Sequence, residues 1–311
     1  MTDFFLAYRP LIDLFLLHIG FAFSQWIVLK AGVFSVATAG FAALGAYTAA
    51  LVGVSLGLPP ALGILAACLV GLAASLVLSW PLARLRGVYQ AIATLAFVQI
   101  VVSLVLYAEP LTGGALGFTG IPKVVTTPVL LMAALLAIWL MVAIDRSRVG
   151  RAFEAIRQDE AMAASLGISV RLHHVIAFAI SGALAGLFAG LEAFHSYALE
   201  PNQFGFPFLV AILSYVVLGG RRTVVGPIVG AAILIALPEL SRPLAENRMV
   251  IYGVLLVLVM NFLPRGVADT FIDRMRRLRA ARLKTGREGP PPASRERPAP
   301  AARPASEPAA P

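Results

Sequence analysis

The feature that most constrains this chain is a series of long apolar stretches. The clearest cover residues 61–80, 88–107, 128–144, 175–194 and 250–263, and several approach the ~20 residues that an α-helix needs to cross ~30 Å of hydrocarbon. Because lipid offers no partner to free backbone groups and the alternation typical of strands is absent, these stretches predict spanning helices. With 59% hydrophobic and 13% charged residues, the chain cannot bury its apolar side chains in one water-soluble core. We expect an all-α polytopic membrane protein with about 8–10 transmembrane or re-entrant helices.

The residue types needed for catalysis or metal binding are sparse. Cys68 is the single cysteine, which excludes an internal disulfide and a cysteine-based metal site. The histidines at 18, 173, 174 and 195 show no metal-ligand spacing with nearby carboxylates. The first residues, MTDFFLAYRP, lack a basic region and a cleavage site, so we interpret the first span as an uncleaved anchor. We therefore expect neither an enzyme nor a metal site.

Arginine placement predicts the orientation of the spans. Arginines occur at 84 and 86, through the central loop from 146 to 171, and at 221 and 222, and the positive-inside rule places these loops in the cytoplasm. The parity of the intervening spans then places the C-terminus in the cytoplasm as well. Residues 206–220 and 223–238 are short and are either two brief spans or one re-entrant pair.

Two glycine-rich segments suggest a weak internal repeat. Residues 31–57 contain five glycines, which favours a broken or re-entrant helix, and residues 219–232 occupy a similar place in the second half. Only Gly45-Ala46 and Gly230-Ala231 align between them. The alternative is that both segments are packing faces of small residues.

Glycines and polar residues within the spans are better explained by packing than by chemistry. Gly182, Gly186 and Gly190 recur every four residues and predict one helix face that a neighbouring backbone can approach closely. In the span 88–107, Gln90 and Thr94 share one side, whereas Gln99 and Ser103 lie nearly opposite, so all four cannot line one pore. Interhelical hydrogen bonding is therefore the favoured role of the polar residues in this span. The candidate substrate-path residues of the whole chain are Ser35, Thr38, Gln90 and Thr94.

Two acidic residues, Glu109 and Glu192, fall near the predicted outer ends of their spans. An intramembrane acid is a candidate for a proton relay, but at these positions we expect water to solvate both side chains. The loop TGGALGFTG at 112–120 is expected to face outward, as a flexible connection or as part of an outer mouth.

The C-terminal segment differs in composition from the rest. Residues 271–311 hold ten Lys or Arg against four acids, and RMRRLRAARLK is expected to lie along the anionic inner leaflet of the membrane. The Pro/Ala-rich remainder has almost nothing to bury and is expected to be disordered. A nucleic-acid role would need a folded basic surface, which the segment does not offer. We therefore divide the chain into a membrane domain, residues 1–270, and a cytoplasmic tail, residues 271–311.

One short segment is charged where its surroundings are apolar. Residues 150–167, GRAFEAIRQDEAMAASLG, lie in the predicted cytoplasmic loop 145–171 and predict a helix of about three turns that ends at Gly167. Phe153 and Ile156 offer apolar contacts. Such a helix either docks into another protein or lies at the membrane surface.

Several motifs in colinear order resemble one family. GRAFEAIRQDEAMAASLGISVRLHHVIAFAISGALAGLFAG closely resembles the cytoplasmic loop and following span of LivM-type permease subunits of branched-chain amino acid ATP-binding-cassette importers. Further similarity lies in GVFSVATAGFAALGAYTAAL, RLRGVYQAIATLAFVQI, TGGALGFTGIP and VVLGGRRTVVGPIVGA, so that the resemblance covers roughly residues 20–265.

The resemblance implies a role for the charged segment and a set of partners. Residues 150–167 would be the coupling helix that fits a groove on the ATP-binding subunit, with contacts from Gly150, Arg151, Phe153, Glu154, Ile156, Arg157, Asp159, Glu160 and Gly167. The sequence has no G-x-x-x-x-G-K-[ST] motif, so the nucleotide is expected on a separate protein and this chain needs no cofactor. The implied partners are a LivH-type permease subunit, two ATP-binding subunits and a periplasmic substrate-binding protein, at the bacterial inner membrane.

Departures from the family pattern concern the substrate. Residues 32–41 lack the glutamine and histidine common in relatives, Leu116 replaces a usual asparagine, and Arg222 replaces a usual glycine. Urea, short amides or aromatic acids are therefore alternative substrates to branched-chain amino acids. A secondary transporter would need buried coupling charges, and a membrane enzyme would need a convergent His, Asp or Glu cluster.

Overall fold

The computed structural model describes residues 2–240, 253 and 266–270, and this part of the chain is almost entirely helical. Its elements are α1 (Thr2–Lys30), α2 (Thr38–Ala50), the π-helix η1 (Leu51–Ser55), α3 (Pro60–Leu82), α4 (Val88–Tyr107), α5 (Glu109–Thr112), the 3₁₀ turn η2 (Gly114–Leu116), β1 (Phe118–Thr119), α6 (Thr127–Arg146), α7 (Arg148–Gln158), α8 (Glu160–Ser165), α9 (Val170–His195), β2 (Ala198–Leu199), the 3₁₀ turn η3 (Pro201–Phe204), α10 (Phe206–Gly219) and α11 (Val225–Leu240).

The predicted fold class is confirmed. Within the described residues, 7 helical segments are long and apolar enough to cross a membrane, and Val225–Leu237 is a shorter apolar helix. Four of the predicted stretches match α3, α4, α6 and α9 closely. The predicted span 250–263 and the tail 271–311 lie outside the described residues. The chain is therefore an all-α, multi-pass membrane protein.

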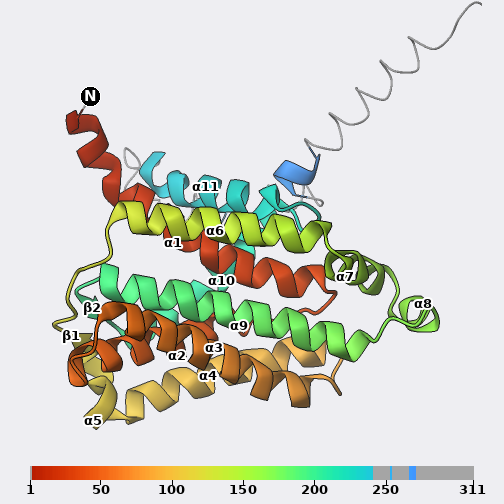
Figure 1. Ribbon diagram of the computed structural model, residues 1–311, viewed down its shortest axis with the longest axis horizontal. Coiled ribbons are helices and arrows are strands. Elements are labelled where there is room, and N and C mark those ends of the chain that lie inside the picture. Colours follow the sequence, from red (N-terminus) through yellow and green to blue (C-terminus); the bar gives the residue numbers. More distant parts are fainter. Residues whose placement is uncertain (1, 241–252, 254–265, 271–311) are drawn as a thin grey trace, which may run out of the picture. The chain divides into compact units, whose positions relative to one another are not determined.

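Helix α9 lies at the centre of the bundle. It contacts α1, α2 and α3, and most of its side chains from Ala177 onward are buried. Figure 1 shows α1, α3, α4, α6 and α9 running side by side, with α7 and α8 beyond one end and β1, β2 and α5 at the other. Helices α3, α4 and α6 lie at the periphery, where only one face of each is buried.

Glycines on α9 allow main chains to touch. A Cβ on Gly186 would lie 2.2 Å from the carbonyl oxygen of Ala67 in α3, and a Cβ on Gly182 would lie 2.3 Å from that of Gly71. From the other side, a Cβ on Gly45 of α2 would lie 2.7 Å from the Cα of Gly186. A Cβ on Gly190 would lie 2.9 Å from the Cβ of Ala67 and 3.2 Å from the Cα of Ile64. The glycine face of α9 is thus the contact surface for α2 and α3.

The helix is interrupted after α1 at Gly32 (φ 87°), one of the five glycines that suggested a break. Residues 31–37 are non-helical, and the chain re-enters helix at Thr38 and continues through α2 into η1. Gly40 and Gly45 lie inside α2, where Gly40 faces Phe97 and Gly45 faces Gly186. These glycines therefore serve close packing, and the predicted internal repeat remains a prediction.

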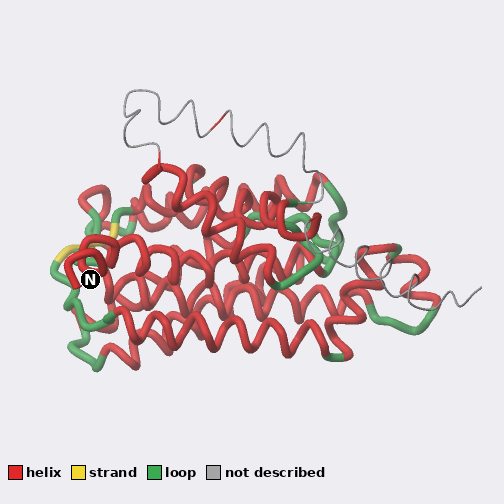
Figure 2. The backbone as a smooth tube through the Cα atoms, turned by 90° about the horizontal axis from the view of Figure 1, so that it is seen from above, coloured by secondary structure: helices red, strands yellow, loops and turns green. Residues whose placement is uncertain are grey.

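Short strands join two loops at the end opposite α7. Phe118 pairs with Leu199 and Thr119 with Ala198 in an antiparallel ladder. Figure 2 shows these strands in yellow among the loops at that end. The loop 112–120 is therefore held by strand pairing rather than being a free connection.

The same end contains buried polar groups that sequence reasoning missed or misplaced. Asp13 of α1 is buried, and its Oδ2 lies 3.7 Å from Nε2 of His195. The Nδ1 of His195 lies 3.2 Å from the carbonyl oxygen of Val125. Glu109 is exposed as expected, but Oε2 of Glu192 is buried without a hydrogen-bond partner. The expectation that water solvates Glu192 is therefore wrong, because packing around α9 covers this oxygen.

Helices α10 and α11 pack against each other through small residues. A Cβ on Gly219 would lie 1.8 Å from the carbonyl oxygen of Gly226, which leaves room only for glycine. Asp269 closes the turn between them, accepting hydrogen bonds from the backbone N–H of Arg222 at 2.9 Å and the hydroxyl of Thr223 at 2.8 Å.

Candidate coupling site

The charged segment begins as an amphipathic helix, α7. Ser147 caps its N-terminus, where the hydroxyl oxygen accepts a hydrogen bond from the backbone N–H of Gly150 at 3.4 Å. Phe153 is 0% exposed and Ile156 is 2% exposed, and the ring of Phe153 contacts His173 edge to face. The expectation that these two residues offer apolar contacts to another protein is therefore wrong, because the helical bundle itself buries them.

The segment contains two helices rather than the single helix expected. Asp159 adopts an extended conformation that ends α7, and its carboxylate caps α8 by accepting hydrogen bonds from the N–H groups of Ala161 and Met162 at 2.8 and 2.9 Å. After α8, Gly167 takes the left-handed conformation (φ 83°) typical of a helix end. Hydrogen bonds from backbone N–H groups to the Asp159 side chain compete with those of a continuous helix, so the helix breaks at this residue.

Helix α7 is fixed closely to the ends of α6 and α1. A Cβ on Gly150 would lie 2.3 Å from the carbonyl oxygen of Ile144, so only glycine permits this turn. Arg151 donates a hydrogen bond to the carbonyl of Arg146 at 3.1 Å. After α1, Gly32 packs against the backbone of Arg157. Since α7 also contacts α9, it touches three membrane-spanning helices.

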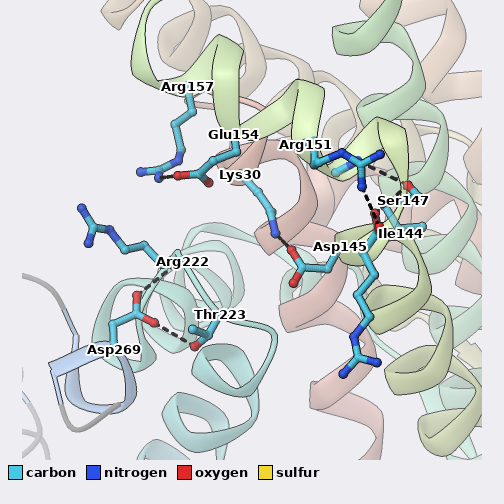
Figure 3. Close-up of polar contacts among 12 residues, drawn as sticks. Lys30, Ile144, Asp145, Ser147, Arg151, Glu154, Arg157, Arg222, Thr223 and Asp269 are labelled. Atoms are coloured by element: carbon cyan, nitrogen blue, oxygen red, sulfur yellow. Dashed lines mark hydrogen bonds and ion pairs between the residues drawn. The ribbon is translucent and has the colours of Figure 1, made fainter. Parts of the chain in front are cut away.

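Charged side chains strengthen this junction (Figure 3). Lys30 at the end of α1 forms an ion pair with Asp145 at the end of α6, and its ammonium lies 4.6 Å from the centre of the Trp26 ring. Glu154 pairs with Arg157 on α7. Burial alone would raise the pKa of Glu154, but the hydrogen bond and charge of Arg157, with smaller effects of Gln158 and Lys30, lower it overall.

The outward surface of the segment carries residues that sequence reasoning did not select. Met162 of α8 and Leu166, directly after the last residue of α8, are 65% and 71% exposed. Their spacing of four residues was the available signal. Arg151 in the first turn of α7 and Asp159 at the start of α8 are also exposed. Glu160 lies 3.8 Å from Arg86 in the α3–α4 turn. We define Met162, Leu166, Arg151 and Asp159 as the outer surface of the coupling site.

Comparison with known proteins identifies the family. The sequence profile described as "Branched-chain amino acid transport system / permease component" matches residues 11–260. The chain belongs to this permease family. It is 33% identical over 280 residues, 78% of its length, to the high-affinity branched-chain amino acid transport system permease protein LivM of Escherichia coli. It is 33% identical over 275 residues to the LivM of Salmonella typhimurium.

The relatives also include the second type of permease. The chain is 32% identical over 130 residues, 41% of its length, to the high-affinity branched-chain amino acid transport system permease protein LivH of Salmonella typhimurium. It spans 65% of the length of the two LivM relatives. No solved structure matches the chain. The similarity to LivM therefore extends over about twice as many residues as the similarity to LivH.

The candidate substrate-path residues of the permease lie inside the bundle. The hydroxyl of Thr38 donates to Oε1 of Gln25 at 2.9 Å, and the amide of Gln25 donates to the carbonyl of Ser35. The hydroxyl oxygen of Thr94 accepts from the backbone N–H of Val36 at 3.1 Å. These hydrogen bonds satisfy polar backbone groups of the non-helical segment before α2. A role of these residues in the substrate path remains a prediction.

The titratable residues of the permease form no metal centre in the described part of the chain. No group of three or more His, Cys, Asp or Glu side chains there could hold a metal ion. The charges instead form pairs, at Lys30 with Asp145 and at Glu154 with Arg157. This arrangement suits a structural connection between helices.

Proposed function

We propose that this chain is a permease subunit of an ATP-binding-cassette importer and forms part of the translocation path for branched-chain or related amino acids. It would lie in the bacterial inner membrane with its C-terminus in the cytoplasm. A LivH-type permease, two ATP-binding subunits and a periplasmic substrate-binding protein would complete the transporter. The ATP-binding subunits would supply the nucleotide site, so this chain holds no cofactor.

The connection of α7 to three spans carries this proposal. Gly150 joins α7 to α6 without intervening side chains, Gly32 brings the end of α1 against it, and Phe153 packs on His173 of α9. A force applied to α7 therefore reaches the ends of α1 and α6 through main-chain contacts and the start of α9 through a side-chain contact. Such a junction converts the movement of a partner at the membrane surface into relative movement of spans.

The outer surface of the coupling site supplies the contact for the ATP-binding subunit. Met162 and Leu166 are large apolar side chains in water, and a partner that covers them removes apolar area from solvent. Arg151 and Asp159, exposed on the same charged segment, carry opposite charges that would fix the orientation of the partner. In this proposal α8 provides the apolar contact that the sequence suggested for Phe153 and Ile156.

Transport by reconstituted vesicles tests the proposal. We would place the permease, its LivH-type partner and the ATP-binding subunits in vesicles and measure leucine uptake with ATP and the binding protein, each also omitted in turn. Competition by phenylalanine and urea would define the substrate class. Uptake that requires all components supports the proposal, and uptake without ATP or the ATP-binding subunits contradicts it.

Variants of α8 test the coupling surface separately. Met162→Asp with Leu166→Asp should abolish uptake and co-purification of the ATP-binding subunits, while membrane levels stay normal. The matched control exchanges the same two apolar side chains, as Met162→Leu with Leu166→Met, and should retain both. Wild-type uptake by the aspartate variant would show that α8 does not carry the contact.

A further inference from the structure

Helix α4 carries polar residues on two opposite faces that have different surroundings. On the inner face, Gln90 and Thr94 are buried, and Thr94 bonds to the segment before α2. On the outer face, Tyr89, Ile92, Ala96, Gln99 and Ser103 are exposed at intervals of three or four residues and form one continuous stripe. We call these five residues the outer stripe of α4.

Gln99 and Ser103 are the unusual members of the outer stripe. Gln99 lies about 16 Å from the start of α4 and about 12 Å from its end, at ~1.5 Å per residue, so it is deep within the span. Neither side chain has a hydrogen-bond partner on another side chain in the described part of the chain. Hydrocarbon would leave the amide of Gln99 unsatisfied, so lipid is an unsuitable neighbour for this face.

The other peripheral helices show what a lipid-facing surface of this protein looks like. The exposed residues in the middle of α3 are Leu65, Leu69, Ala73, Leu76 and Val77, and those of α6 are Leu131, Met132, Leu135, Leu136 and Trp139. None of them carries an amide or a charge. The exposed face of α4 also carries the apolar residues Ile100 and Leu104, but it differs from both in placing Gln99 and Ser103 beside them at mid-span.

We propose that the outer stripe of α4 lines the translocation path, with Gln99 and Ser103 forming hydrogen bonds to the passing solute. This proposal rests on the proposed function, which supplies a second permease subunit as the opposite wall of the path. A carboxamide can both donate and accept, and a hydroxyl can do the same, so the two side chains match both the carboxylate and the ammonium of a zwitterionic amino acid. Because they are uncharged, they bind such a solute without holding it tightly.

Thiol labelling tests whether the stripe borders water. In a Cys68→Ala background, Gln99→Cys and Ser103→Cys would be treated in vesicles with a hydrophilic, membrane-impermeant thiol reagent. The matched control is Leu136→Cys at a similar depth on the apolar face of α6. The reagent attacks the thiolate, which forms only where water reaches the sulfur. We expect at least ten-fold faster labelling at positions 99 and 103 than at 136.

Two results would overturn the proposal. Labelling of positions 99 and 103 as slow as that of position 136, in an assembled transporter, would show that the stripe faces lipid. Efficient cross-linking of the Gln99→Cys variant to the second permease together with slow labelling would show a dry contact between subunits. Labelling needs no transport, so its outcome is independent of whether the proposed amino-acid substrate is correct.

Uptake measurements test the role of Gln99 in recognition. Gln99→Leu should lower kcat/KM for leucine uptake at least ten-fold, whereas Gln99→Asn, which keeps the amide, should recover most of it. The control Leu136→Ala should leave uptake unchanged. Wild-type uptake by Gln99→Leu would refute solute contact by this residue, and loss of uptake in both Gln99 variants with normal assembly would refute recognition through the amide.

Discussion

The ammonium of Lys30 and the carboxylate of Asp145 form an ion pair that links the last turn of α1 to the last turn of α6. The Lys30 side chain is 4% exposed and that of Asp145 is 34% exposed, so the pair lies at the edge of the membrane domain beside α7. The two residues are far apart in the sequence, and only the fold brings them together.

Breaking this ion pair should destabilise the junction at which the ends of α1 and α6 meet α7. Lys30→Met leaves Asp145 without its partner, and we expect a double-mutant cycle with Asp145→Asn to give a coupling energy of about 1–3 kcal/mol, less than for a fully buried pair because Asp145 is partly hydrated. Denaturation of the purified protein in detergent provides the measurement. Additive effects of the two substitutions would show that the pair contributes no net interaction.

Two glycines of the coupling site should respond differently to alanine. Gly150→Ala places a Cβ against the carbonyl oxygens of Ile144 and Asp145, so the α6–α7 turn must open and uptake should fall at least ten-fold. Gly167→Ala meets no atom within 4 Å and should cost only the ~1–2 kcal/mol of a left-handed conformation. Uptake and thermal stability of both variants test this difference. Equal losses of uptake would show that close approach at Gly150 is not the constraint.

Thr38 should matter through its hydroxyl. Thr38→Val keeps the shape but removes the hydrogen bond to Gln25, and we expect a loss of stability of about 0.5–2 kcal/mol. Thr38→Ser keeps the hydroxyl and should lose less. Thermal denaturation compares the two variants; a larger loss in Thr38→Ser would indicate that packing of the methyl group dominates.

The pairing of Glu154 with Arg157 predicts a specific pH dependence. Because the pKa of Glu154 is lowered in the folded protein, its contribution to stability is complete above the unfolded pKa of about 4.3 and is lost as the pH falls through the folded pKa. The stability difference between wild type and Glu154→Gln should therefore be constant from about pH 6 to pH 8 and shrink below about pH 4.5. Melting temperatures across this range test the sign. A difference that grows on acidification would contradict it.

The spans were predictable because their signal is local. A helix that crosses lipid must satisfy its backbone within itself, so α3, α4, α6 and α9 follow from continuous apolar stretches. The end of α8 at Gly167 was predictable for a similar reason, since a left-handed residue favours glycine.

The site was less predictable because its contacts are tertiary. Phe153 and Ile156 satisfy the pattern of a docking face, and the sequence alone cannot say that α9 occupies that face. The pairing of Lys30 with Asp145 and of Asp13 with His195 depends on helix neighbours that no local pattern specifies. The break at Asp159 has a local cause, its capping of α8, but aspartate is also tolerated within helices.

The crossing of α2, α3 and α9 at Gly186 limits which parts of the permease can be displaced independently. Main-chain atoms of these helices meet there without intervening side chains, so rotating or sliding one against the others would drive backbone into backbone. These three helices therefore form one rigid block. Helix α1 meets α10 through the side chains of His18 and Tyr215, and it meets α6 through those of Lys30 and Asp145. Interfaces made by side chains can shear by changing rotamers. An alternating-access cycle in this protein would place its moving boundary beside α1 and leave the glycine crossing as the fixed frame.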